Sequence, residues 1–310
     1  MNYTKALQIK SGRAICYSGF REGQSPGGIY PSYEEIKEDL LMLHDHWTYL
    51  RLYDCDEHTT TVLEVIDKEQ LDLKVMLGAY IVAEANNYGC PWGGTYSEEQ
   101  LEHNKVENTS LIQKLIQLAN QYPEIIFSLS AGNEACVDWT DHYVPVENVI
   151  HYVKMIKAGT KQPVTFCENY LPWLDKLKDL VDVVDFISIH TYPVWEYKNI
   201  HEALEYTKQN YYSVADTYPH KAVVITEAGW TTFSNGKGIC PSNVSEEHQR
   251  IYYNDLINWS EEADILTFVF EAFDEPWKGS GEILEPEKHW GLFKVDRSPK
   301  LVMNELFART

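Results

Sequence analysis

Strand-like and helix-like segments alternate along the whole chain, and this alternation constrains the fold more than any other feature of the sequence. Short apolar runs rich in Val and Ile are typical of buried strands, and apolar residues at helical spacing mark the segments between them, as Ile36, Leu40 and Leu43 do. The predicted strands are 14–20, 47–54, 73–81, 125–134, 163–170, 185–193, 222–230 and 265–273. The predicted helices are 33–46, a helix through 62–66, 97–120, 147–158, 173–180, 200–217, 245–260 and 301–307.

Eight strand and helix pairs in strict order predict a closed (β/α)8 barrel, the TIM barrel, because parallel strands need crossovers and eight of them can close on themselves. No Pro/Gly/Ser-rich linker or low-complexity segment divides the 310 residues, so we expect a single catalytic domain over 1–310. An open doubly wound sheet is the alternative. It is disfavoured because no GxGxxG motif follows the first strand and polar residues collect at the strand C-termini all round.

The charge balance bears on the partners of the protein. Acids outnumber bases 47 to 26, and the formal charge of -21 repels phosphate backbones and anionic lipids, so we expect a neutral partner and neither nucleic acid nor a membrane. No run approaches the roughly 18 apolar residues of a membrane span. Residues 1–14 lack the apolar core of a signal peptide and the six Cys show no CxxC pairing, which predicts a cytoplasmic protein with reduced thiols. A secreted chain trimmed of its signal peptide would look the same.

Polar residues at the strand ends are the candidates for function, because the active site of such a barrel lies at its C-terminal face. They are Arg51, Asp54, Asn133, Glu134, Glu168, Asn169, His190, Tyr192, Glu227, Glu271, Asp274, Glu275 and Lys278. Taken alone, any one strand-end acid could simply meet solvent or a Lys. Several acids converging at one end repel one another, which a protein tolerates where the charges are used.

Two of these acids, Glu134 and Glu227, end long apolar strands on opposite sides of the predicted ring. Paired carboxylates suit the cleavage of a glycosidic bond, where one donates a proton to the leaving oxygen and the other stabilises or attacks the anomeric carbon. This chemistry needs no metal ion and no other cofactor. A carboxylate metal site would call for a His pair or several Asp at ligand spacing, so we interpret the lone His190 as a hydrogen-bonded barrel residue.

Five motifs lie in order on the predicted strands: YLRLYD (49–54), SLSAGNE (128–134), ISIHTYP (187–193), VVITEAGW (223–230) and FEAFDEPWK (270–278). With them the chain resembles glycoside hydrolase family 17, the β-1,3-glucanases and glucanosyltransferases, from Cys16 to about Phe293. The resemblance implies a (β/α)8 barrel that acts on β-1,3-glucan or its oligosaccharides.

The resemblance also implies roles for individual residues. Glu134 matches the acid/base, and Asn133 matches the residue whose amide holds the sugar 2-hydroxyl. Glu227 matches the nucleophile of a retaining double displacement, with Tyr192 orienting it and Arg51 keeping it ionised. The acid must be protonated near neutral pH while the nucleophile must stay charged, so their surroundings should differ. In a retaining enzyme the two carboxyl groups should lie about 5 to 5.5 Å apart.

The sequence indicates the substrate-binding residues less clearly than the catalytic ones. Glu275 and Lys278 match a polar pair that family members carry beside the site, and Arg51 and Lys278 could also serve only as salt-bridge partners. Trp230 and Trp277 lie within motifs, so we expect them to stack on pyranose rings. The other tryptophans near strand ends could stack or pack; they are Trp92, Trp139, Trp173, Trp195 and Trp290.

The sequence is compatible with more than one activity. Ala228 takes a place often held by a small hydroxyl residue, and DEPWK is closer to the bacterial and fungal branch, which includes transglycosylases and exo-acting members. We expect a retaining hydrolase, with a glucanosyltransferase on the same substrates as the alternative. A barrel that only binds carbohydrate is the alternative outside enzymology, but it has no use for a protonated acid beside a bare carboxylate. The sequence leaves the oligomeric state open.

Overall fold

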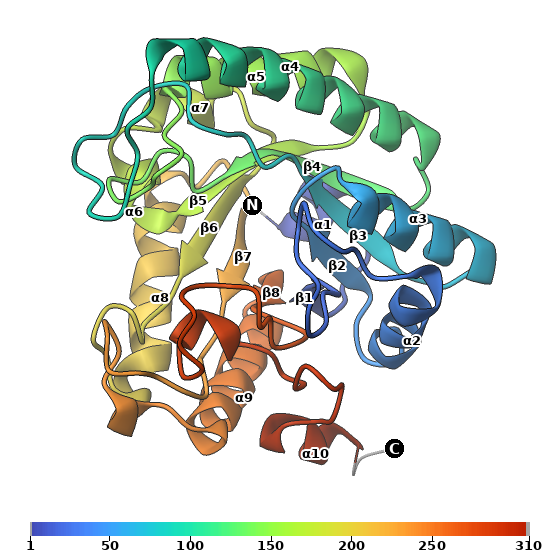
Figure 1. Ribbon diagram of the computed structural model, residues 1–310, viewed down its shortest axis with the longest axis vertical. Coiled ribbons are helices and arrows are strands. Elements are labelled where there is room, and N and C mark those ends of the chain that lie inside the picture. The colour runs from blue at the N-terminus through green and yellow to red at the C-terminus, as the bar shows by residue number, and fades with distance from the viewer. Residues whose placement is uncertain (1, 308–310) are drawn as a thin grey trace.

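The computed structural model describes residues 2–307, which form a closed barrel of eight parallel strands in the order β1 to β8, surrounded by helices (Figure 1). The strands are β1 (Ala14–Cys16), β2 (Tyr49–Leu52), β3 (Lys74–Gly78), β4 (Ile126–Asn133), β5 (Val164–Asn169), β6 (Ile187–Thr191), β7 (Val223–Ala228) and β8 (Thr267–Val269). The helices are α1 (Tyr3–Leu7), α2 (Tyr33–Leu43), α3 (Glu57–Glu69), α4 (Glu98–Gln121), α5 (Val146–Gly159), α6 (Tyr170–Leu174), α7 (Lys178–Val181), α8 (Ile200–Thr217), α9 (Glu246–Glu262) and α10 (Leu301–Phe307). The predicted fold class is confirmed.

The predicted elements differ from the observed ones mainly at their ends. The strands are shorter than the apolar runs; β1, for example, stops at Cys16 because the chain after it turns away into the loop that carries Ser18 towards Glu275. The predicted helix 173–180 is two short helices, α6 and α7, separated at Asp175, a residue type that disfavours helix interiors. The first helix, α1, was not predicted, because five residues are too few to show a helical period.

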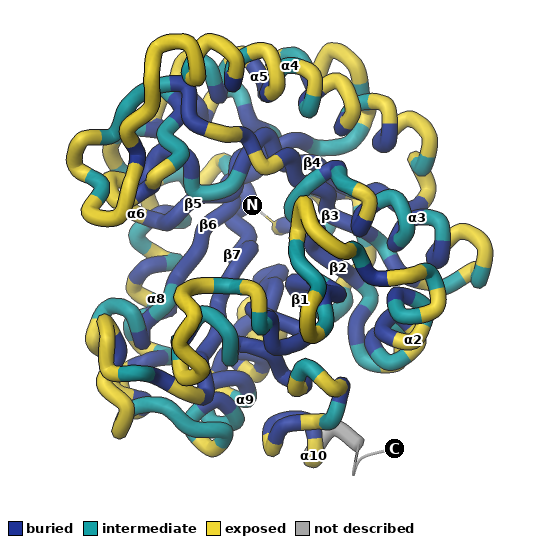
Figure 2. The backbone as a smooth tube through the Cα atoms, in the orientation of Figure 1, coloured by how far each residue is buried: buried dark blue, intermediate teal, exposed yellow. Residues whose placement is uncertain are grey.

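The barrel strands are buried on both faces. Every residue of β1, β2, β5, β6, β7 and β8 is buried, and Figure 2 shows the strands as buried tubes inside partly exposed helices. At the end of β7 a Cβ on Gly229 would lie 2.1 Å from the backbone oxygen of Phe270. Only glycine lets the two segments approach this closely. No helix within residues 2–307 is both long and apolar enough to span a bilayer.

A buried ion cluster joins α2 to the segment before α10. The Asp39 carboxylate is fully buried and accepts hydrogen bonds from Arg297 Nε at 2.8 Å and from an Arg297 terminal nitrogen at 2.7 Å. Arg21 donates to the same carboxylate at 3.2 Å, and the Tyr17 hydroxyl donates at 3.1 Å. The cluster therefore ties the last part of the chain to the first strand and helix unit.

We expect Arg297→Ala to lower the free energy of unfolding by about 3 to 5 kcal/mol, because it leaves the buried Asp39 carboxylate without its bidentate partner. Urea unfolding followed by circular dichroism measures the loss. The matched control is Arg13→Ala, which removes an exposed pair with Glu261 and should cost less than about 1 kcal/mol. Equal losses in the two variants would contradict a structural role for the cluster.

Candidate active site

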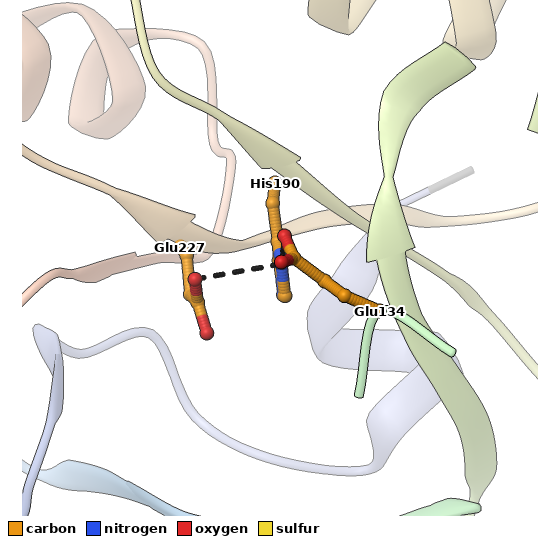
Figure 3. Close-up of side chains that lie close together, drawn as sticks. All are labelled: Glu134, His190 and Glu227. Atoms are coloured by element: carbon orange, nitrogen blue, oxygen red, sulfur yellow. Dashed lines mark hydrogen bonds and ion pairs between the residues drawn. The ribbon is translucent and has the colours of Figure 1, made fainter. Parts of the chain in front are cut away.

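Glu134 and Glu227 face each other at the C-terminal mouth of the barrel. Glu134 directly follows β4 and Glu227 lies near the end of β7, and Figure 3 shows their side chains pointing toward each other and toward His190 on β6. One oxygen of each carboxylate and a ring nitrogen of His190 all lie within 4.8 Å of one another. The two acids that the sequence singled out are therefore close enough to act on one bond.

Glu227 is the more buried of the two carboxylates and is held by donors on both oxygens. Its side chain is 7% exposed, against 28% for Glu134. Arg51 and the Tyr53 hydroxyl, the latter at 3.0 Å, donate to Oε1, and the Tyr192 hydroxyl donates to Oε2. Burial alone would raise the pKa of this carboxyl, but the charges of His190 and Arg51 outweigh it and lower the pKa to about 2. Glu227 is therefore a bare carboxylate at neutral pH.

Arg51 and Tyr192 lie where the resemblance implies, whereas Tyr53 was missed. Arg51 is buried, and a second terminal nitrogen donates to Asn133 Oδ1 at 2.5 Å, so this one side chain links the end of β4 to the end of β7. Tyr53 follows Arg51 by two residues, so alternation along the strand places both on one face. That spacing within YLRLYD was the signal that could have identified it.

His190 lies between the two carboxylates and is fully buried. Its Nδ1 is 2.7 Å from Glu134 Oε1 and 3.4 Å from Glu227 Oε2. Burial would lower the pKa of the ring, but the charge of Glu227 and the bonds to its neighbours raise it to about 10. His190 is thus a cation that hydrogen-bonds to Glu134 and forms an ion pair with Glu227, in line with its interpretation as a hydrogen-bonded barrel residue.

The same three side chains could in principle share a metal ion. Among residues 2–307, Glu134, His190 and Glu227 are the group whose ligand atoms lie close enough for one. A histidine ligand must be neutral at the coordinating nitrogen, whereas the raised pKa of His190 keeps its ring protonated beside the two carboxylates. The donor set therefore fits a proton better than a metal ion.

A second charged cluster lies after β8. Lys278 Nζ is 3.0 Å from Glu271 Oε2 and also pairs with Glu275, whose Oε1 accepts bonds from the Ser18 hydroxyl and from Trp277 Nε1. Burial and the charge of Glu275 raise the pKa of Glu271, while the charge of Lys278 outweighs burial and lowers the pKa of Glu275. The predicted pair of Glu275 and Lys278 is present, with Glu271 as a third member.

Aromatic rings connect this cluster to Glu227. Lys278 Nζ lies 4.5 Å from the centroid of the Phe270 ring, and that ring meets Tyr192 in an edge contact at 5.7 Å. Trp277 is 38% exposed, so one part of its indole is free to meet a ligand. The position of Trp277 fits its predicted contact with a sugar.

The prediction that Trp230 stacks on a pyranose ring is wrong. Its side chain is 1% exposed, its Nε1 donates to the Asn243 backbone oxygen at 3.1 Å, and its ring packs against Tyr252 on α9. Trp230 turns into the layer between barrel and helix because residues that follow a strand end alternate in direction. Trp173 and Trp290 are also buried, whereas Trp92 and Trp139 are exposed.

The family model of the BtgE/BtgC glycoside hydrolase domain matches residues 14–291, a range that contains all eight strands and both carboxylates. The chain belongs to this family. Membership places the protein among the glycosidases, which agrees with two carboxylates that face each other across the mouth of a barrel.

Similar proteins from two fungi align over most of the chain. A putative glucan endo-1,3-beta-glucosidase, btgC, from Aspergillus niger is 27% identical over 296 residues, covering 87% of this chain. The chain spans about 40% of the length of that relative. A glucan 1,3-beta-glucosidase from Arthroderma benhamiae is 21% identical, and the alignment covers 91% of this chain and 88% of the relative.

Solved structures of similar shape support the fold. An endo-laminarinase from Formosa Hel1_33_131 has a TM-score of 0.82 and 27% identity, with 96% of this chain and 86% of that chain covered. An active-site mutant of a beta-1,3-glucanosyltransferase from Rhizomucor miehei has a TM-score of 0.72, 21% identity and coverage of 94% and 96%. At 21% identity, the likeness to the glucanosyltransferase supports the barrel fold alone.

Arg51→Met is expected to lower kcat by about 10² to 10³-fold, because it removes the cation that faces the buried Glu227 carboxylate. Loss of this charge raises the pKa of Glu227, and a carboxylate that acts as a nucleophile must be ionised, so in that role the acidic limb of the kcat/KM profile should move to higher pH. Kinetics between pH 3 and 8 measure both effects. Arg13→Met, at an exposed ion pair, is the matched control, and an unmoved acidic limb in Arg51→Met would contradict this role.

Proposed function

We propose that the protein is a retaining β-1,3-glucanase of glycoside hydrolase family 17 that cleaves laminarin-type glucan or its oligosaccharides by double displacement. The observation that carries the proposal is the approach of a Glu134 oxygen and a Glu227 oxygen to within 4.8 Å. Retaining enzymes hold their carboxyl groups about 5 to 5.5 Å apart, whereas inverting enzymes need about 6.5 to 9.5 Å to admit a water molecule.

The names of the similar proteins support the choice of β-1,3-glucan. They include glucan endo-1,3-beta-glucosidases, an endo-laminarinase and a probable family 17 glucosidase, SCW4, from Saccharomyces cerevisiae that is 24% identical over 287 residues. The formal charge of -21 suits a neutral polysaccharide. An endo mode of cleavage is favoured because the two proteins named as endo-acting are each 27% identical to this chain, against 21% for the glucan 1,3-beta-glucosidase.

The surroundings of the two carboxylates support the roles that the resemblance implies. Glu227, held ionised by Arg51, Tyr53 and Tyr192, attacks the anomeric carbon, and the bond from that carbon to the glycosidic oxygen breaks. Glu134, the more exposed of the two, enters this step in its protonated form and gives that proton to the leaving oxygen. The product of this step is an ester between the sugar and Glu227.

The second step restores the enzyme. The ester has no charge, so Glu134 faces a neutral group and can take a proton from an incoming water molecule. The water oxygen bonds to the anomeric carbon, and the Glu227 carboxylate leaves with the electrons of the ester bond. Because Asn133 Oδ1 is held by Arg51, the Nδ2 donors are the part of its amide that can bind the sugar 2-hydroxyl.

A ladder of β-1,3-gluco-oligosaccharides labelled at the reducing end tests the proposal. We expect shorter labelled products from the β-1,3 ladder and none from a matched β-1,4 ladder. Products longer than the starting chain at high substrate concentration would identify the glucanosyltransferase alternative, in which a sugar hydroxyl replaces water. Absence of any product from the β-1,3 ladder would contradict both activities and favour a barrel that only binds carbohydrate. The cytoplasmic location stays a prediction, which fractionation of the source cells tests.

A further inference from the structure

His142, in the loop between β4 and α5, contacts the backbone beside the catalytic acid candidate. Its Nε2 lies 2.9 Å from the backbone oxygen of Asn133, the carbonyl of the peptide that leads into Glu134. A carbonyl oxygen can only accept a hydrogen bond, so Nε2 carries the hydrogen and donates it. The ring therefore bonds to the chain one residue before the carboxyl that meets the leaving group.

The His142 ring is itself held in place from several directions. Its Nδ1 lies 2.9 Å from Asp141 Oδ1 and 3.1 Å from Thr140 Oγ1. The ring packs against Tyr80, with centroids 4.9 Å apart and an angle of 33° between the planes. The side chain is 14% exposed. A ring fixed in this way presents its Nε2 hydrogen in one direction, towards Asn133.

The peptide between Asn133 and Glu134 needs contacts that hold its conformation. Glu134 has a φ of 47°, in the left-handed region that a side chain other than Gly seldom adopts, so the surrounding contacts must hold it there. The Glu134 N–H donates to the Cys167 backbone oxygen at 2.9 Å, and His142 fixes the carbonyl on the other end of the same peptide. Rotation of this peptide would swing the Glu134 carboxyl away from the glycosidic oxygen.

We propose that His142 is a positioning residue that locks the Asn133 to Glu134 peptide through its Nε2–H, so that the Glu134 carboxyl stays aligned with the leaving oxygen. The inference rests on the proposed role of Glu134 as acid/base. His142 acts through the backbone and takes no part in proton transfer itself. Misplacing a catalytic group by about 1 Å can cost roughly 100-fold in rate, which sets the size of the expected effect.

Two substitutions separate the hydrogen bond from the packing. His142→Phe keeps a ring against Tyr80 and removes both ring nitrogens, and His142→Gln keeps an N–H that can reach the Asn133 oxygen. Each is compared with wild type on a laminari-oligosaccharide, whose leaving group needs a proton, and on a 2,4-dinitrophenyl β-glycoside, whose leaving group does not. His220→Phe, an exposed site in the connection from α8 to β7, is the matched control.

We expect His142→Phe to lower kcat/KM on the oligosaccharide by about 30 to 100-fold and on the dinitrophenyl glycoside by less than about three-fold. Hydrolysis of the glycosyl ester needs Glu134 as a base, so kcat on the dinitrophenyl glycoside should fall although kcat/KM hardly changes, and azide, a nucleophile that needs no base, should restore that kcat. His142→Gln should recover most of the oligosaccharide activity. Equal losses on both substrates, or no loss on either, would overturn the proposal. Each loss is the ratio of wild-type to variant kcat/KM on the same glycoside. A wrong assignment of the linkage would appear as a wild-type protein that does not cleave the oligosaccharide, which is a different outcome from a wrong role for His142.

Discussion

Glu227→Ala is expected to lower kcat on β-1,3-gluco-oligosaccharides by at least about 10⁴-fold, because the variant has no group that can form the glycosyl ester. The cavity left beside Arg51, Tyr53 and Tyr192 lies on the side of the anomeric carbon opposite the leaving group. A small anion such as azide can enter there and attack in one step. The sugar product with azide should therefore be the α-glycosyl azide, which NMR identifies.

The control for Glu227→Ala is Glu168→Ala, a buried acid at the end of β5 whose carboxylate oxygens accept bonds from the backbone N–H groups of Cys136 and Asn169. Burial and the charge of Glu134 raise the pKa of Glu168 to about 8. Its hydrogen bonds go to backbone N–H groups, so its substitution removes a buried acid near the site but neither of the two carboxyl groups that face each other. We expect a much smaller loss of kcat than for Glu227→Ala once the folded fraction is taken into account. More than a few percent of wild-type activity in Glu227→Ala would contradict its role as nucleophile.

Glu134→Gln is expected to lower kcat/KM on the oligosaccharides by about 10³-fold, because the amide cannot protonate the leaving oxygen. A 2,4-dinitrophenyl glycoside leaves without that proton, so the first step should proceed and the glycosyl ester should accumulate. Azide should then release the sugar as the β-glycosyl azide, since it enters from the face that Glu134 lines. The basic limb of the wild-type pH profile should be absent for the activated substrate in this variant.

The opposite configurations of the two azide products are the decisive control for the assignment. Exchange of the products between Glu227→Ala and Glu134→Gln would mean that the roles of the acids are reversed. An equal and large loss on natural and activated substrates in Glu134→Gln would mean that Glu134 has no part in leaving-group protonation.

The barrel could be predicted from the sequence because its local and global signals agree. Apolar runs recur at strand length, and the helices between them carry apolar faces. Both patterns are those of repeated strand and helix units in a barrel. The strand ends could not be placed, because aromatic residues such as Tyr17 after β1 and Phe270 after β8 continue the strand-like pattern, and only the tertiary position of the loops removes them from the sheet. The start of α8 was predicted correctly, and there Asn199 and Glu202 form a capping box.

The site was predictable where the chemistry lies on strand ends and unpredictable where it depends on side-chain direction. Glu134 and Glu227 follow from the topology once the strands are ordered. Trp230 was misassigned because neighbouring positions after a strand end point to opposite sides, and the sequence does not say where the alternation breaks. His142 was missed because it lies eight residues beyond Glu134 in an irregular loop, where spacing carries no information about contact.

Trapping the glycosyl-enzyme tests the central claim most directly. A 2-deoxy-2-fluoro β-laminaribioside with a 2,4-dinitrophenyl leaving group slows both steps, and the good leaving group keeps the first step faster than the second. The account predicts that wild-type protein gains the mass of one fluorinated disaccharide and that peptide mapping places it on Glu227. Wild-type protein that cleaves β-1,3-glucan yet gains no adduct, or carries the adduct on another residue, would contradict it.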